Sequence, residues 1–222
     1  MRQLYHIAID PGCRTIRVML AEKGLDCELR TEKVWERREV FLRLNPAGQV
    51  PVFIDEDGTT IAGTAVIAEY LEEVRPEPTL LGGNPIDRAE VRRLAEWFGG
   101  KFHHEVTANL VDEKIMKRFL GLGTPNSGAI RAGLANIHYH LEYIGWLSDR
   151  RRWLAGDAFS RADITAAAEL SAVDYLGDVP WAEHTGAKDW YARVKSRPSF
   201  RAILADHISG VRPPKHYADL DF

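Results

Sequence analysis

Three side chains near the N-terminus have types and spacing that could support chemistry: Tyr5, Asp10 and Cys13. Cys13 follows a Pro-Gly turn at the start of an expected helix, where the helix dipole favours the thiolate, the nucleophilic form of cysteine. Asp10 opposes this, because an ionised carboxylate only accepts hydrogen bonds and raises the pKa of a neighbouring thiol. The pattern favours a structural role for Cys13, as a small buried residue. The alternative is that Cys13 or Tyr5 is a catalytic group.

The histidines do not form a metal-binding pattern. His103 and His104 are adjacent, and His138 and His140 are two residues apart, so the members of each pair face different sides of a helix. No carboxylate joins either pair at the spacing that a metal site requires. We therefore expect no metal.

Composition limits the possible partners. The chain has 222 residues, 45% of them hydrophobic, which is enough for one large or two small domains. The net charge of −3 provides no field that would attract nucleic acid, and the run Arg150–Arg152 is too short to change this. No apolar run is long enough to span a bilayer, and Cys13 and Cys27 form no disulfide framework. These features indicate a cytoplasmic protein that neither inserts into a membrane nor binds nucleic acid.

Two strands and a helix must position the N-terminal turn. Residues 4–9 and 26–34 read as strands, and the helix between them ends at Gly24, a residue that favours a helix C-terminus. A unit of this length implies parallel strands joined by a right-handed crossover. A second helix is expected over 35–44.

The segment Asn45–Glu73 reads as a hairpin followed by a helix. Residues 50–54 and 59–61 are short apolar strands, and Asp57-Gly58 between them tolerates the positive φ of a tight turn. Apolar residues then recur at helical spacing up to Glu73. The predicted order over the first 75 residues is therefore βαβαββα.

The rest of the chain has helical periodicity. Residues 76–86 are rich in Pro and Gly and read as a linker, residues 87–208 as an all-helical domain, and residues 209–222 as a tail. One long helix is expected from Asp87 to about Phe119. Within GDAFSRAD, the spacing of Ser160 and Asp163 predicts a capping box that starts another helix.

The motifs NPAGQVPVF, DG and VIAEYLEE, together with G-D-x-F-S-x-A-D, resemble the glutathione S-transferase superfamily. The resemblance covers about residues 4–205. It implies an α/β thioredoxin-like N-terminal domain followed by the family's all-helical C-terminal domain.

The resemblance also implies a cis Val50–Pro51 bond and a remnant glutathione site. The donor that would stabilise the glutathione sulfur is missing, because Asp10 stands where Ser- and Cys-type relatives place it. The family's usual Glu-Ser pair is replaced by Gly63-Thr64, although Thr64 can still cap the helix or bind a carboxylate. We therefore expect weak or absent glutathione binding and no catalytic residue. The remnant site consists of Asp10, Gln49, Val50, Pro51, Gly63 and Thr64.

Three further features suggest a protein partner. Trp35 lies beside Arg37 and Arg38, and Trp and Arg are enriched at binding hot spots. The helix tip 112–119 has a mixed-charge face with apolar residues, although a solvated tip also explains it. The tail has an aromatic, acidic end that either packs on the fold or contacts a partner. The predicted partner-binding residues are Trp35, Tyr217, Asp219, Leu220, Asp221 and Phe222.

The chain resembles a bacterial member of the family that binds the tubulin-like division protein FtsZ. The resemblance rests on three features: WERR after the second strand, the missing donor and the PPKHYADLDF end. This resemblance implies a non-catalytic homodimer that regulates cell division at the division site. The alternative is a transferase that conjugates glutathione to small electrophiles. A carrier of apolar ligands is a third possibility, without a specific motif in its favour.

Overall fold

The computed structural model describes residues 1–220, and the fold class expected from the sequence is confirmed. In the first domain, a four-stranded sheet has the order β2-β1-β3-β4, in which β1 pairs parallel with β2 and the other pairings are antiparallel. Its elements are β1 (Arg2–His6), α1 (Pro11–Glu22), β2 (Cys27–Thr31), η1 (Val34–Glu36), α2 (Glu39–Leu44), β3 (Val52–Ile54), β4 (Thr60–Ala62) and α3 (Thr64–Val74).

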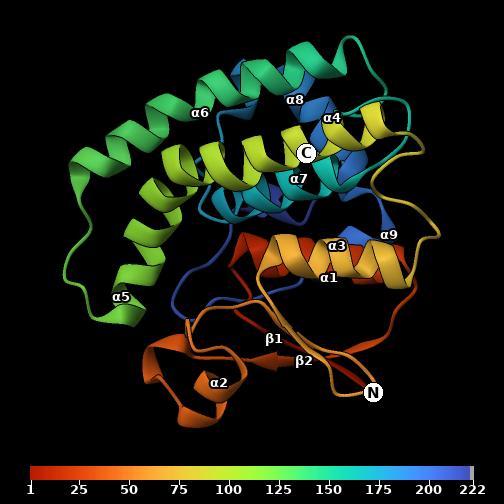
Figure 1. Cartoon of the computed structure of the whole chain (residues 1–222). Coiled ribbons are helices and arrows are strands. Elements are labelled where there is room, and N and C mark those ends of the chain that lie inside the picture. The colour runs from red at the N-terminus through yellow and green to blue at the C-terminus, as the bar shows by residue number, and fades with distance from the viewer. Residues whose placement is uncertain (221–222) are drawn as a thin grey trace.

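Figure 1 shows α1 and α3 side by side between the sheet and the helices of the second domain, with α2 set apart at the lower left. The Val50–Pro51 peptide bond is cis, as the family resemblance implies. A second cis bond, Glu77–Pro78, was not predicted.

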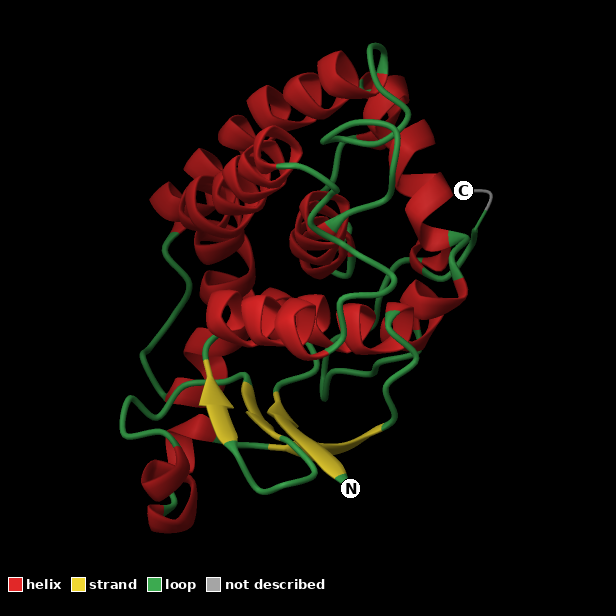
Figure 2. Ribbon diagram, turned by 45° about the vertical axis from the view of Figure 1, so that its right-hand side comes forward, coloured by secondary structure: helices red, strands yellow, loops and turns green. Residues whose placement is uncertain are grey.

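The second domain is helical throughout. Its elements are α4 (Pro85–Glu96), η2 (Trp97–Met116), α5 (Lys117–Leu120), α6 (Ser127–Ser148), α7 (Arg161–Asp174), η3 (Trp181–Glu183), α8 (Thr185–Lys195), α9 (Pro198–Leu204) and η4 (Lys215–Tyr217). Figure 2 shows these helices stacked above the sheet. Every residue of α7 is buried, because this helix packs on α1, α4, η2 and α8.

The segments α4, η2 and α5 form one continuous helical run from Pro85 to Leu120, close to the single long helix predicted from the sequence. Its middle part, η2, has the wider π-type hydrogen bonding instead of the α type. Helix α6 packs closely on it at Gly133, where a Cβ atom would lie 2.8 Å from Leu110 Cγ. A glycine is needed at this contact because a side chain would push the two helices apart.

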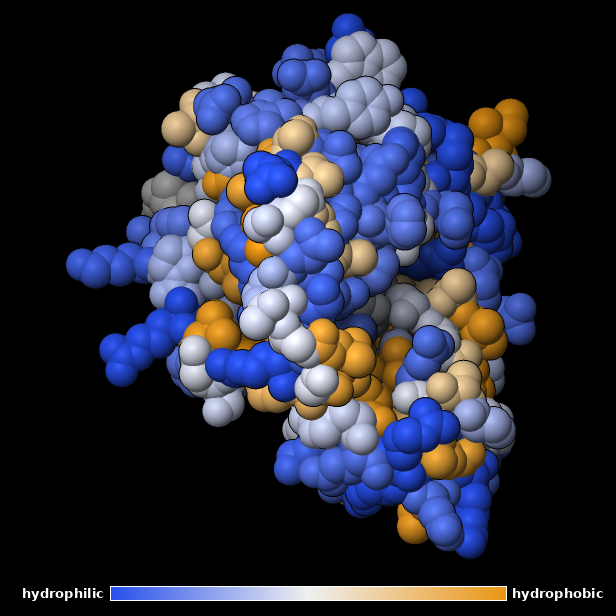
Figure 3. Space-filling model, turned by 90° about the vertical axis from the view of Figure 1, so that its left-hand side faces the viewer, coloured by the Kyte–Doolittle hydropathy of each residue, from blue (hydrophilic) through white to orange (hydrophobic). Residues whose placement is uncertain are grey.

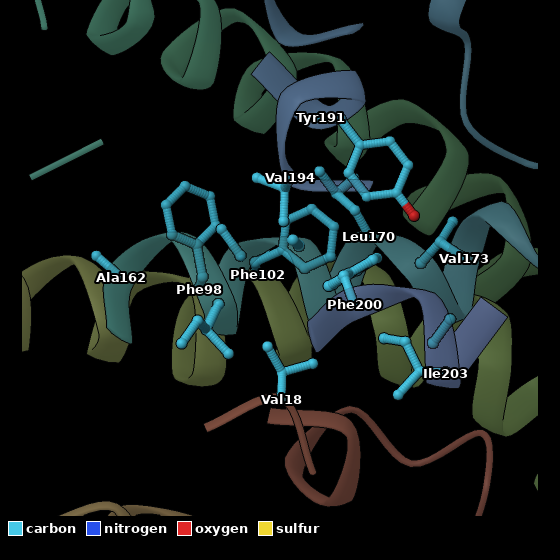
Figure 4. Packing of buried hydrophobic residues seen from close by; sticks show 14 of the residues in the cluster. Val18, Phe98, Phe102, Ala162, Leu170, Val173, Tyr191, Val194, Phe200 and Ile203 are labelled. Atoms are coloured by element: carbon cyan, nitrogen blue, oxygen red, sulfur yellow. The ribbon is translucent and has the colours of Figure 1, made fainter. Parts of the chain in front are cut away.

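One hydrophobic core joins the two domains. In Figure 4, Val18 of α1 points toward Phe200 and Ile203 of α9, while Phe98 and Phe102 of η2 enter the same cluster from another side. The predicted linker is also packed, since Leu80 and Leu81 are buried and Lys23 Nζ donates to the Pro78 carbonyl at 3.1 Å. The domains therefore share their interior.

The predicted capping box at the start of α7 is present. The Asp163 carboxylate accepts hydrogen bonds from the backbone N–H groups of Ser160 and Leu154, at 3.1 and 2.9 Å. It also accepts from Trp190 Nε1 at 3.0 Å. Asp163 is fully buried, so this family motif has a structural role: it holds the start of α7.

We predict that Asp163→Ala lowers the free energy of unfolding by about 3 kcal/mol, because three buried donors lose their acceptor. Urea denaturation measures this change. Asp189→Ala, at an exposed position of α8, is the control and should change stability by less than about 0.5 kcal/mol. Equal stability of the two variants would contradict the structural role of Asp163.

Candidate functional site

A cavity of about 230 Å³ lies between the two domains. The first domain contributes the start of α1, the turn before β3 and the start of α3, and the second contributes α4, η2 and α7. The lining residues are Asp10, Gly12, Thr15, Val50, Thr64, Ala65, Ala68, Ala95, Glu96, Gly99, His103, Arg161, Thr165 and Glu169. Of the predicted remnant glutathione site, Asp10, Val50 and Thr64 thus line one cavity, while Gln49, Pro51 and Gly63 do not.

Asp10 serves as the N-cap of α1. Its Oδ1 accepts a hydrogen bond from the Cys13 backbone N–H at 2.7 Å, so one exposed donor of the helix start is already satisfied. Burial raises the pKa of Asp10. Burial, together with the nearby Asp10 carboxyl, raises the pKa of the Cys13 thiol well above its usual value. Cys13 is fully buried and does not line the cavity, so it presents neither a thiolate nor an accessible sulfur.

The expectation that Thr64 caps the third helix is wrong. Helix α3 begins at Thr64 itself, and its N-cap is Gly63, which has φ +92° and no side chain to accept a hydrogen bond. The Thr64 hydroxyl instead packs against the first turn of α1, where a Cβ atom at Gly12 would collide with Thr64 Oγ1. The hydroxyl faces the neighbouring helix because the glycine at position 12 leaves room for it.

The opposite wall carries an ion pair that the sequence analysis did not identify. His103 Nδ1 lies 3.1 Å from Glu169 Oε1, and the Thr107 hydroxyl donates to Glu169 Oε2 at 2.5 Å. The hydrogen bond to the buried Glu169 carboxylate raises the pKa of His103 to about 9. His103 is therefore a cation at neutral pH. Its partner is 66 residues away, so no local spacing could reveal the pair.

A second group of ion pairs joins the two domains beside the cavity, near α3. Arg161 Nη1 donates to Glu69 Oε1 at 2.7 Å, and Arg92 Nη2 donates to Glu69 Oε2, also at 2.7 Å. Glu69 belongs to the first domain and both arginines to the second. These bonds fix the two walls of the cavity relative to each other, and they lower the pKa of Glu69.

The other catalytic candidate, Tyr5, lies away from the cavity. Its ring packs on Phe41 of α2 with the centroids 5.6 Å apart. In the part of the chain that the structure describes, the cavity lining includes no Ser, Tyr or Cys. The hydroxyl groups in this lining are those of Thr15 and Thr64.

Trp35 contacts the second domain. Its ring stacks on Phe119 of α5, with centroids 5.2 Å apart and an interplanar angle of 11°. Arg37, two residues on, has φ +46° and is the one non-glycine residue with positive φ among residues 1–220. Figure 3 faces the side of the molecule where α2 and α5 lie in Figure 1, and apolar side chains gather there between the two domains.

The terminal segment folds back on the helical domain. Tyr217 is fully buried, and its ring meets Tyr175 edge-on at 5.1 Å. Leu220 is half-buried against the core, whereas Asp219 is exposed and accepts a hydrogen bond from Lys195 through its backbone carbonyl. The remaining predicted partner residues, Asp221 and Phe222, lie outside the described residues.

Among the residues that the structure describes, no cluster of three or more His, Cys, Asp or Glu side chains could hold a metal ion. The same residues include no helix with the length and apolar character needed to cross a bilayer.

The fold and the cavity between its domains define the class of protein. The chain belongs to the glutathione S-transferase family: residues 11–74 match the family's N-terminal domain and residues 139–198 its C-terminal domain. It is 46% identical to FtsZ-localized protein A of Caulobacter vibrioides over 224 aligned residues, which cover 100% of this chain and 98% of that protein.

Solved structures agree with this assignment. The structure of FzlA from C. crescentus matches with a TM-score of 0.96 at 46% identity, covering 100% of this chain and 99% of the other. A crystal structure of a glutathione S-transferase from Rhodospirillum rubrum F11 matches with a TM-score of 0.98 at 60% identity, covering both chains completely.

The His103–Glu169 pair predicts a change of stability with pH. The pKa of His103 is about 9 in the folded protein, above the ordinary value of 6.5. The contribution of protonated His103 to the free energy of unfolding is therefore complete below pH 6.5 and is lost as the pH rises to about 9. We expect a loss of about 1 kcal/mol over this range, a value reduced for solvent screening of the partly exposed ring.

Unfolding free energies measured from pH 6.5 to 9 test this expectation. His103→Gln should remove the decline, even though it also lowers stability overall by leaving Glu169 without its charged partner. His104→Gln, at an exposed position next to it on the same helix, should retain the decline. An unchanged slope in His103→Gln would show that the pair does not titrate in this range.

Proposed function

We propose that this chain is a non-catalytic member of the glutathione S-transferase family that binds FtsZ filaments and regulates bacterial cell division through protein contacts. The identity of 46% to FtsZ-localized protein A over the whole chain carries the proposal. The agreement with the FzlA structure over its full length supports it.

The chemistry of the cavity supports the absence of catalysis. Thiolate attack requires a hydrogen-bond donor near the sulfur, but Asp10 occupies this region and already caps α1. Cys13, the nearest thiol, is buried and protonated. The cavity between the domains is retained, but its described lining includes no Ser, Tyr or Cys.

The partner surface that we propose is centred on Trp35. The ring stack on Phe119 holds the indole in one orientation, which reduces the side-chain entropy that binding would cost. Arg37 adds a cation at a strained backbone position, and such positions cluster at functional sites. An aromatic side chain beside an arginine is the composition of a binding hot spot.

For the terminal segment, we propose a division of roles. Tyr217 anchors the segment in the core. Asp219, Leu220, Asp221 and Phe222 remain the proposed partner contacts. A variant that deletes residues 215–222 would remove the anchor as well as the contacts, so single substitutions of the last four residues are the cleaner test.

We further propose a cytoplasmic homodimer that acts at the division site. Two copies of one binding surface related by a two-fold axis could cross-link filaments. The outer face of α6 is the proposed contact, because Tyr139 and Trp146 are about half exposed there. Trp146 stacks on Tyr143, and Tyr139 contacts Trp97 in a tilted arrangement. A monomeric mass in light scattering would rule this out.

Co-sedimentation with FtsZ polymer tests the proposed surface. We expect the protein to sediment with the polymer, and Trp35→Ala to weaken binding by about 30-fold, the effect of a hot-spot residue worth 2 kcal/mol. Trp35→Phe, which can still stack on Phe119, should retain part of the affinity. Ile86→Ala, an exposed apolar residue at the start of α4, is the control and should bind normally. Full binding by Trp35→Ala would exclude this surface.

A glutathione transferase is the second candidate function. A relative with 60% identity is described as a glutathione S-transferase, and the cationic His103 in the cavity could attract an anionic substrate. Retention on glutathione-agarose and conjugation of a chlorinated aromatic compound distinguish the two. We expect neither above background, because the described lining of the cavity includes no Ser, Tyr or Cys. Turnover that disappears in Cys13→Ala would instead favour the enzyme.

A further inference from the structure

The last turn of the long helix lies between Trp35 and the terminal segment. Helix α5 spans only Lys117–Leu120 and ends at Gly121, which has a left-handed conformation with φ +66°. The loop beyond it is exposed, with Leu122 63% accessible. A helix end of this kind frays unless other parts of the structure hold it.

Arg118 provides such a contact to the terminal segment. Its Nη2 donates a hydrogen bond to the Ser209 carbonyl. The neighbouring Gly210 has φ +76°, and a Cβ atom there would lie 2.8 Å from Arg118 Nη1. The guanidinium therefore packs directly against the backbone of the 209–210 turn, and a glycine leaves the space it needs.

A buried tyrosine, Tyr175, makes two hydrogen bonds to the backbone of the same turn. The Tyr175 hydroxyl accepts from the Ile208 N–H at 2.9 Å and donates to the Val211 carbonyl at 3.0 Å. Ile208 and Val211 also form an antiparallel bridge. Since Tyr175 lies at the end of the fully buried α7, the turn is a rigid support for the arginine.

Arg118 also contacts the aromatic stack. Its guanidinium carbon lies 4.8 Å from the centroid of the Phe119 ring, within the range of a cation–π contact. The Phe119 ring in turn stacks on Trp35. Contacts therefore run without a gap from the 208–211 turn, through Arg118 and Phe119, to η1 of the first domain.

We propose that Arg118 is a positioning residue through which the 208–211 turn orders Trp35 for partner binding. The start of the terminal segment is then coupled to the proposed binding surface around Trp35. The ordering of Trp35 stands on the contacts alone, whereas its effect on binding rests on the proposed function. An ordered surface binds more tightly because less entropy is lost on association.

Hydrogen exchange of the free protein tests the ordering. The reporters are the amides of Glu36 and Arg37, which donate to the carbonyls of Lys33 and Val34 in η1. In Arg118→Ala they should exchange about fivefold faster, as expected for the loss of one cation–π contact and one hydrogen bond, with global stability little changed. Arg118→Lys keeps the charge but not the planar group, and should restore protection only in part.

Two matched controls separate this effect from general damage. Arg150→Ala removes an arginine that makes the same kinds of contact elsewhere, over the Trp146 ring at 4.3 Å and to the Trp146 carbonyl at 2.9 Å. Arg150→Ala should leave the amides of η1 protected from hydrogen exchange. Gly210→Ala should displace the guanidinium and expose η1, whereas Gly24→Ala, which has a similar φ of +63° and no atom within 4 Å, should not.

Co-sedimentation with FtsZ polymer completes the test, and we expect Arg118→Ala and Gly210→Ala to bind more weakly than the control Gly24→Ala. Unchanged protection of η1 in both variants would overturn the inference. Faster exchange in both, with unchanged FtsZ binding, would support the ordering role and would count against Trp35 as the FtsZ surface. The two proposals can thus fail separately.

Discussion

Eight of the twelve residues of helix α1 are buried between the sheet and the helical domain, and the rest of the structure depends on this contact. The buried Arg14 holds it in place, because its Nε donates to the Ala8 carbonyl and its Nη1 to Ser171 Oγ of α7, both at 2.8 Å. A charged group without water is stable only where hydrogen bonds replace the lost hydration. A shift of one domain along the other would break the bond between Arg14 and Ser171.

The fixed position of α1 decides the character of the cavity. It places Asp10 at the meeting point of the two domains, where the carboxyl group satisfies the start of its own helix. The opposite wall carries His103, whose charge is neutralised by Glu169 within the protein. Asp10 and His103 thus both have partners within the fold itself.

The boundary between the domains also shapes the outer surface. The Trp35–Phe119 stack and the Glu69–Arg161 ion pair both join the two domains. Contacts of this kind order loops that would otherwise be mobile, so a surface formed across the boundary can be as rigid as one within a single domain. The surface around Trp35, next to the interdomain cleft, is therefore ordered by a contact with the second domain.

The sequence by itself determined the features that depend on neighbours a few residues away. The strand and helix order, the Asp57-Gly58 turn, the capping box of Ser160 and Asp163 and the family motifs all follow from local spacing and residue type. The prediction that Asp10 is unsuited to stabilise a thiolate also needs only the chemistry of an ionised carboxylate.

The tertiary structure decided the pairings between distant residues. His103 with Glu169, Trp35 with Phe119 and the burial of Tyr217 depend on how whole helices pack, and no local pattern encodes them. Thr64 shows the same limit at close range: its residue type suits a cap, but the backbone places Gly63 at that position. Side-chain type sets what a residue can do, and packing sets what it meets.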